Sequence, residues 1–233
     1  MGKIYAIVVA AGKGERMASD VAKQYILLCG KPVILYSLEI FDSIDAIDGI
    51  VLVVAACDVS YVCESLLTKH TLKKKVSVVI GGFNRQQSVL NGLNSIPHDA
   101  DFVVIHDGVR PLITEQIVSN GIDEAANHGA VAVGVPVKDT IKIVDSQNFI
   151  SSTPMRDELW IVQTPQIFRY ETIFAAHKKA LEDGFIGTDD SILAERSGVS
   201  VKMIKGSYRN IKITTSEDLI LAQELIKFSG GSL

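Results

Sequence analysis

Short apolar runs rich in β-branched residues alternate along this chain with segments whose apolar residues recur at helical spacing. The runs are typical of strands buried on both faces, and they cover residues 4–9, 50–55, 76–80, 102–106 and 130–137. Helical spacing occupies the intervals at 32–44, 58–70, 84–96 and 114–128. Because the connections are short, we expect an α/β fold with a mostly parallel central sheet and helices on both faces.

Residues 138–162 break this alternation. Apolar and polar residues alternate here around Asp145-Ser146-Gln147-Asn148, a sequence with turn chemistry. The pattern predicts a β-hairpin arm that projects from the main sheet. A lone hairpin is marginally stable in water, so we expect the arm to pack on another surface, most simply a second subunit. We expect a single domain over residues 1–228, with the arm at about 138–162 and a flexible tail at 229–233.

Composition excludes several classes of protein. The chain has 233 residues, 47% of them hydrophobic, which is ample for one substantial core. A formal net charge of −4 argues against bulk nucleic-acid binding. No run approaches the roughly 18 apolar residues of a membrane span, and the N-terminus lacks a signal-peptide pattern. The 3 cysteines form no C-x-x-C pair, so we expect free, buried thiols and a cytoplasmic location.

The first expected strand opens into a glycine-rich, basic loop, Ala10-Ala11-Gly12-Lys13-Gly14-Glu15-Arg16-Met17, which Lys23-Gln24 follows. Backbone amides and cations in such a loop make an anion site. A dinucleotide-binding turn needs a third glycine where Met17 stands, and a P-loop needs Gly-Lys-Ser/Thr, which is absent. A nucleotidyltransferase loop fits the cations Arg16 and Lys23, and an ordinary solvated connection stays open as the alternative.

Polar residues also follow the later expected strands. In open α/β sheets, ligands bind beyond the carboxyl ends of the strands. The residues at these positions are Gly81-Gly82 with Arg85 and Ser88, Asp107 with Arg110, Lys138-Asp139-Thr140, and Lys212. Several cations and one carboxylate suit phosphoryl or nucleotidyl transfer, which depends on positioning, magnesium and charge stabilisation.

Two of these loops carry specific hypotheses. Asp107 is the expected ligand of Mg²⁺ or another divalent cation, and a turn-forming role is its plainer alternative. Arg85 and Ser88 lie three residues apart on one helix face. They line a base-and-ribose pocket, or they are a surface arginine and a small buried residue.

Taken together, these motifs resemble the bacterial 2-C-methyl-D-erythritol 4-phosphate cytidylyltransferases of the non-mevalonate isoprenoid pathway. The resemblance covers nearly the whole chain. Each motif alone is weak, and their order is specific. They are Ala10-Ala11-Gly12-x-Gly14-x-Arg16-Met17, Lys23-Gln24-Tyr25, Gly81-Gly82-x-x-Arg85-x-x-Ser88-Val89, His106-Asp107-x-x-Arg110-Pro111, Lys138-Asp139-Thr140, Gln163-Thr164-Pro165-Gln166-x-Phe168, Thr188-Asp189-Asp190 and Asn210-Ile211-Lys212.

The resemblance implies a Rossmann-like nucleotidyltransferase that uses CTP and Mg²⁺ and releases pyrophosphate. It implies that Arg16 and Lys23 stabilise the transition state and that Asp107 helps to hold the metal. The implied CTP-binding residues are Ala10, Ala11, Gly12, Gly14, Gly82, Arg85 and Ser88. The implied acceptor-positioning residues are Arg110, Thr140, Arg156, Thr188 and Lys212. It further implies a homodimer in which the arm crosses to the partner, so that Arg156 acts in trans, with no nucleic-acid or membrane partner.

Three other functions fit parts of the sequence. Ribitol-5-phosphate cytidylyltransferases share the first loop and the reaction, but Met155-Arg156-Asp157-x-x-Trp160 resembles the methylerythritol enzymes more. A non-catalytic nucleotide-binding protein would not need Arg16, Lys23 and Asp107 together. A nicotinamide-dependent oxidoreductase is disfavoured by the missing third glycine.

Overall fold

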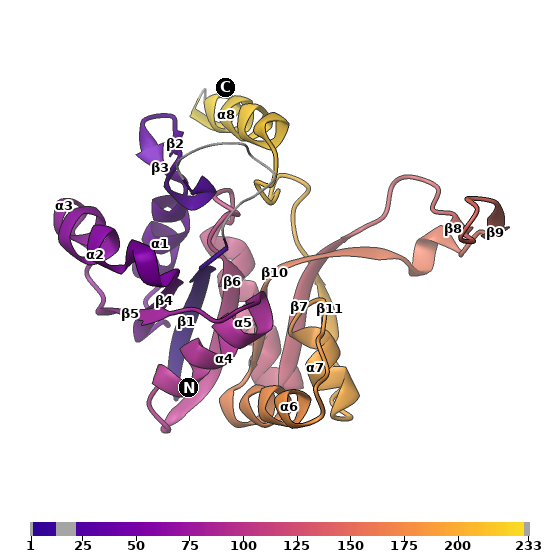
Figure 1. Cartoon of the computed structure of the whole chain (residues 1–233), viewed down its shortest axis with the longest axis horizontal. Coiled ribbons are helices and arrows are strands. Elements are labelled where there is room, and N and C mark those ends of the chain that lie inside the picture. Colours follow the sequence, from indigo (N-terminus) through magenta and orange to yellow (C-terminus); the bar gives the residue numbers. More distant parts are fainter. Residues whose placement is uncertain (1, 13–21, 231–233) are drawn as a thin grey trace.

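A seven-stranded sheet forms the centre of the protein in the computed structural model, which describes residues 2–12 and 22–230 (Figure 1). The spatial order of the strands is β11-β7-β10-β6-β1-β4-β5. Their bounds are β1 (Lys3–Ala10), β4 (Gly49–Val54), β5 (Val76–Ile80), β6 (Ala100–Asp107), β7 (Ala130–Pro136), β10 (Trp160–Arg169) and β11 (Lys202–Lys205). Only β10 runs antiparallel to its neighbours, β6 and β7, so the expected mostly parallel sheet is confirmed.

Helices cover both faces of this sheet, as the alternation predicts. Along β1, Ile4, Ala6 and Val8 belong to one core cluster and Ile7 to the other, because successive side chains point to opposite faces. The first cluster is completed by α1 (Val33–Ser43) and α5 (Glu115–His128). The second cluster is completed by α4 (Arg85–Ser95), α6 (Tyr170–Glu182) and α7 (Ser191–Arg196). Burial on both faces explains why these strands are continuous apolar runs.

Strand β10 was not expected from the sequence. Its middle is polar and contains Pro165, a residue that normally indicates an edge strand or a loop. The pairing of β10 with β7 also shifts register between Val162 and Gln166. Gln163, Thr164 and Gln166 are nevertheless buried, so polar side chains occupy the interior at this point of the sheet.

The segment expected as one helix over residues 58–70 is irregular. It is divided into η3 (Ala56–Asp58), α2 (Val59–Tyr61), the π-helical η4 (Val62–Leu66) and α3 (Leu67–Lys69). Val62 and Leu66 face the core, which leaves Cys63 on the outer side. Cys29, Cys57 and Cys63 are all exposed, so the expectation of buried thiols was wrong.

The expected arm is present. Strands β8 (Ile143–Val144) and β9 (Ile150–Ser152) pair as a hairpin that extends away from the body (Figure 1). The Asp145 carboxylate closes its turn by accepting the amides of Gln147 at 2.9 Å and Phe149 at 3.0 Å. The proposed division into one domain over residues 1–228 and a tail stays a prediction.

The C-terminal helix α8 (Ser216–Gly230) packs in a small third cluster with the β2 (Leu27–Leu28) and β3 (Lys31–Pro32) hairpin. The cluster includes Leu28, Val33 and Ala222. Within the described part of the chain, no helix has the length and apolarity that a membrane crossing requires.

We predict that Phe41→Ala will lower the free energy of unfolding by about 3–5 kcal/mol, because it leaves a cavity in the core. Phe41 on α1 is fully buried, and its ring meets that of His106 edge-on with centroids 5.2 Å apart. Urea unfolding measures the change. The matched control is Phe228→Ala, whose side chain is 80% exposed and should alter stability by at most about 0.5 kcal/mol. Equal losses in both variants would contradict the packing described for α1.

Candidate active site

A pocket of about 630 Å³ opens beyond the carboxyl ends of β1 and β6, the edge at which an open α/β sheet binds ligands. Five separate segments of the described chain line it. The lining residues are Val9, Ala11, Gly12, Lys23, Gly82, Phe83, Asn84, Arg85, Ser88, Asp107, Val109, Lys212 and Thr214.

Asp107, the last residue of β6, is the centre of the charged part of this pocket. Its carboxylate accepts the Arg85 Nε–H at 2.9 Å, and it lies 2.8 Å from Lys212 Nζ and 3.7 Å from Arg110 Nε. Burial alone would raise the pKa of Asp107. The charges of Arg85, Lys212 and Arg110 outweigh burial and hold the pKa well below its usual range. Asp107 is therefore a carboxylate throughout the physiological pH range.

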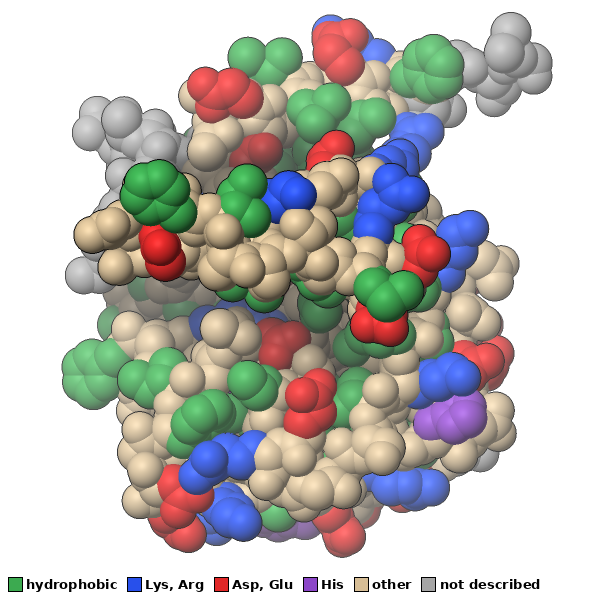
Figure 2. All heavy atoms as spheres, turned by 90° about the vertical axis from the view of Figure 1, so that its right-hand side faces the viewer, with side chains coloured by type: hydrophobic (Ala, Val, Ile, Leu, Met, Phe, Trp, Pro, Cys, Tyr) green, Lys and Arg blue, Asp and Glu red, His purple; other side chains and the backbone are tan. Residues whose placement is uncertain are grey.

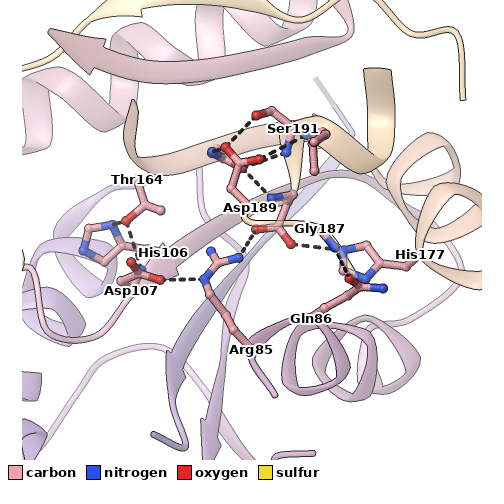
Figure 3. A network of polar contacts seen from close by, with 12 residues as sticks. Arg85, Gln86, His106, Asp107, Thr164, His177, Gly187, Asp189 and Ser191 are labelled. Atoms are coloured by element: carbon pink, nitrogen blue, oxygen red, sulfur yellow. Dashed lines mark hydrogen bonds and ion pairs between the residues drawn. The ribbon is translucent and has the colours of Figure 1, made fainter. Parts of the chain in front are cut away.

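Arg85, the first residue of α4, connects Asp107 to a second buried carboxylate. Its Nη1 donates to Asp190 Oδ2 at 2.8 Å, and His177 Nε2 lies 3.0 Å from Asp190 Oδ1 (Figure 3). Burial disfavours the charge on Arg85, but Asp190 and Asp107 more than compensate and raise its pKa. The third nitrogen, Nη2, is buried and has no hydrogen-bond partner among the described residues. Arg85 thus keeps one donor available for a ligand.

The polar residues of β10 hold the backbone around this pair of carboxylates. Gln166 Oε1 accepts the amides of Asp190 and Ser191, both at 3.0 Å, and its Nε2 donates to Asp189 at 2.8 Å (Figure 3). Thr164 Oγ1 accepts the Asp107 amide at 3.0 Å. The unexpected strand is therefore polar because it positions the residues of the pocket.

His106 has a structural role beside Asp107. It is fully buried, its Nδ1 lies 3.1 Å from Thr164 Oγ1, and its Nε2 lies 3.3 Å from the Arg110 carbonyl oxygen. Burial lowers the pKa of His106 to about 3, so the ring is neutral.

The loop between β5 and α4 is held by side chains of its own helix. Ser88 Oγ accepts the Gly82 amide at 3.0 Å and donates to the Asn84 carbonyl at 2.9 Å. Gln87 Oε1 accepts the Phe83 amide at 3.0 Å, and Asn84 Oδ1 accepts the Gln87 amide at 2.8 Å. The hydroxyl of Ser88 is engaged within the loop, so Ser88 shapes the pocket wall.

The first loop meets this wall closely. A methyl group on Gly81 would lie 2.4 Å from the Ala11 Cβ, so only glycine allows the two loops to pack side by side. Gln24 is buried and donates to the Ala10 carbonyl oxygen at 2.8 Å. That bond ties η2 (Lys23–Tyr25) to the end of β1 and brings Lys23 to the pocket.

The structure brings together most of the predicted site residues that it describes. Ala11, Gly12, Lys23, Gly82, Arg85, Ser88, Asp107 and Lys212 line the pocket, Ala10 ends β1 directly before it, and Arg110 contacts Asp107. Gly14 and Arg16 lie outside the described residues. Thr140, Arg156 and Thr188 are exposed and do not line the pocket. Arg156 lies at the root of the arm, where its Nη1 is 3.4 Å from the Lys138 carbonyl oxygen.

Sequence reasoning missed several residues of the site. Phe83 and Asn84 line the pocket directly after Gly81-Gly82, and their place in that loop was a signal for them. Asp190 was assigned no role in the site, although it belongs to the Thr188-Asp189-Asp190 motif; its neighbour Asp189 caps α7 by accepting the Ile192 amide at 3.1 Å. No local sequence pattern indicated His177, because its partner Asp190 lies 13 residues away, at the start of α7.

Comparison with known proteins gives the family. The sequence model for 2-C-methyl-D-erythritol 4-phosphate cytidylyltransferase matches residues 4–227. The protein of that name from Caldanaerobacter subterraneus subsp. tengcongensis is 48% identical over 96% of this chain and 99% of its own length. The one from Desulforamulus reducens is 46% identical over 97% of each chain.

Comparison with solved structures supports the same family. The crystal structure of 4-diphosphocytidyl-2C-methyl-D-erythritol synthase from Anaerococcus prevotii superposes with a TM-score of 0.87 at 33% identity, covering 97% of this chain and 98% of that one. Fold, motif order and full-length similarity agree, and this chain belongs to the 2-C-methyl-D-erythritol 4-phosphate cytidylyltransferase family.

Proposed function

We propose that the pocket around Asp107 is where this enzyme transfers the cytidylyl group of CTP to 2-C-methyl-D-erythritol 4-phosphate. An oxygen of the acceptor phosphate attacks the α-phosphorus of CTP and forms a new P–O bond. The bond between the α-phosphorus and the bridging oxygen breaks, and pyrophosphate leaves with that oxygen. The observation that carries the assignment is the convergence of Lys23, Arg85, Arg110 and Lys212 at one edge of the sheet, in a chain of this family.

The nucleotide half of the site comes from the first loop and the loop before α4. Phosphoryl transfer needs little covalent help and depends on positioned cations that stabilise charge around phosphorus. We assign this role to Arg16 and Lys23. The proposed CTP-binding residues are Ala10, Ala11, Gly12, Gly14, Gly82, Arg85 and Ser88. The free Nη2 donor of Arg85 and the backbone approach that Gly81 permits support this assignment.

Asp107 suits Mg²⁺ or another divalent cation in charge and position. It is ionised, it lines the pocket, and hard divalent cations prefer carboxylate oxygens. Among residues 2–12 and 22–230, no group of three or more histidine, cysteine or acidic side chains is placed to hold a metal ion alone. Substrate phosphate oxygens would therefore complete the coordination, as is usual for magnesium. When bound, the metal would supply positive charge to those oxygens.

We infer that two chains together form the acceptor half of the site. We assign acceptor binding to Arg110, Thr140, Arg156, Thr188 and Lys212, but only Arg110 and Lys212 lie beside Asp107. Thr140 and Arg156 belong to the root of the arm. A second subunit that inserts its arm would deliver Arg156, so we propose a homodimer.

The surface of the arm supports this dimer. Ile143, Phe149, Ile150 and Met155 are each more than half exposed, which is unfavourable for a hairpin in water. Figure 2 faces the side from which the arm projects and shows hydrophobic side chains open to solvent there. We also propose a cytoplasmic location, where the three exposed thiols would stay reduced.

The purified chain should release pyrophosphate from CTP and Mg²⁺ when 2-C-methyl-D-erythritol 4-phosphate is added. A coupled pyrophosphate assay over a panel of sugar phosphates measures this. Release should be negligible without an acceptor, because the α-phosphorus then lacks its nucleophile. Faster turnover of ribitol 5-phosphate would contradict the proposed acceptor.

Lys23→Ala should lower kcat by about 10²- to 10³-fold, because a cation that stabilises the transition state is removed. Steady-state kinetics measures the loss, and thermal unfolding shows whether the fold is intact. The control is Lys31→Ala, eight residues further along, which loses an ion pair with Glu39 and a cation–π contact with Tyr36, both outside the pocket. Normal turnover in a folded Lys23→Ala variant would remove Lys23 from the proposed mechanism.

Arg156→Ala should raise KM for the acceptor by about 10- to 100-fold and change CTP binding little, because a charge-assisted contact to the acceptor phosphate is lost. Steady-state titration of each substrate separates the two effects. Lys142→Ala, which removes another cation of the arm, is the matched control and should behave like the wild type.

Mixed dimers test whether Arg156 acts in trans. When Lys23→Ala and Arg156→Ala chains exchange subunits, each mixed dimer contains one site with both residues intact only if Arg156 comes from the partner. About half of the dimers would be mixed, so activity should recover to about a quarter of the wild type. No recovery after demonstrated subunit exchange would place Arg156 in the site of its own chain.

A further inference from the structure

Phe83 is a large apolar side chain that lies fully in solvent at the rim of the nucleotide pocket. Its exposure is 101%, and it lines the pocket from the loop between β5 and α4. Scattered exposed apolar side chains are normal on a protein surface. Phe83 differs because two backbone amides of its loop are held by side chains of α4. Its own amide is bonded to Gln87, and the neighbouring Gly82 amide is bonded to Ser88.

The walls of the pocket differ in charge. One wall carries Lys23, Arg85, Asp107 and Lys212. Among the described residues, the other wall carries no charged side chain, and it is continuous because the loop that contains Gly81 packs directly on Ala11. Its lining residues are Ala11, Gly12, Gly82, Phe83, Asn84 and Ser88. A nucleoside triphosphate has the same division, with its charge at one end and a flat, uncharged base at the other. The triphosphate belongs with the cations, which leaves the base with the uncharged wall.

We propose that Phe83 is a nucleotide-binding residue whose ring packs flat against the base of CTP. This inference rests on the proposed function and adds one residue to it. An aromatic ring suits the position because a nucleobase offers a flat π-face, and stacking of this kind contributes substantially to the binding of single nucleotides. Stacking would also cover a ring that water otherwise surrounds.

A competing role exists for the same ring. Phe83 also borders a shallow apolar groove of about 290 Å³ between α4 and α6, which Leu90, Leu181 and Ile186 help to line. If the ring served that groove, its loss would leave nucleotide affinity unchanged. The two roles therefore predict different binding results.

Calorimetric titration of the full chain with CTP, without acceptor, distinguishes them. Phe83→Ala should weaken CTP binding by about 5- to 20-fold, the lower part of the range for loss of a stacked base. It should leave the affinity for inorganic triphosphate, which has no base, unchanged. Phe83→Tyr should retain wild-type affinity. The matched control is Ile186→Ala, which removes a 70% exposed apolar side chain from the neighbouring groove and should bind CTP normally.

Two outcomes would overturn the inference and leave the proposed function standing. One is CTP binding by Phe83→Ala within twofold of the wild type. The other is an equal loss for CTP and inorganic triphosphate, which would mean that the ring only maintains the loop. Failure of the wild type itself to bind CTP would overturn the proposed function.

A fluorescent reporter gives an independent measurement. The chain has 1 tryptophan, Trp160, so the double variant Phe83→Trp, Trp160→Phe carries its only indole at the pocket rim. CTP should quench and shift its emission, and inorganic triphosphate should not. Unchanged emission at saturating CTP would place the base away from position 83.

Discussion

The carboxylate of Asp107 is the point to which the rest of the site is tied. Arg85, Arg110 and Lys212 come from three separate segments, and each is drawn to this one side chain. Without a buried anion, three cations would repel one another in a partly desolvated pocket. Asp107 therefore assembles the cationic wall before any substrate is present. In the proposed reaction, phosphate oxygens take over this role, and Lys212 exchanges its carboxylate partner for the acceptor.

The need to balance buried charge extends into the core through Arg85. Its guanidinium also needs Asp190, and Asp190 in turn needs His177 and the side chain of Gln166. Removing one partner of a buried ion pair typically costs about 3–5 kcal/mol, because the other charge is left uncompensated. The position of Arg85 is thus coupled to the packing of α6, α7 and β10. This coupling keeps a long, flexible side chain fixed beside the pocket, which a surface arginine would not achieve.

The parts of this structure that repeat locally could be predicted from the sequence, and those that depend on distant partners could not. Apolar runs such as residues 50–55 identify buried strands, and the rule that ligands bind beyond the strand ends placed Lys23, Asp107 and Lys212 near one another. Strand β10 was missed because its buried Gln163, Thr164 and Gln166 do not look like a strand interior. Their partners lie far away in the sequence, as do those of Arg85, so no local pattern reveals them.

The arm also combines a feature that local sequence predicts with one that depends on a distant partner. Its hairpin could be predicted from alternation and turn residues, whereas the fixed direction of its root depends on Tyr208. The ammonium group of Lys138 lies 3.6 Å from the centre of the Tyr208 ring, and the Tyr208 hydroxyl donates to the Pro136 carbonyl at 2.7 Å. These contacts anchor the root to the body while the tip exposes Phe149 and Ile150. A segment held at its base and apolar at its tip is suited to dock on another surface, and Arg156 lies at the anchored root beside Lys138.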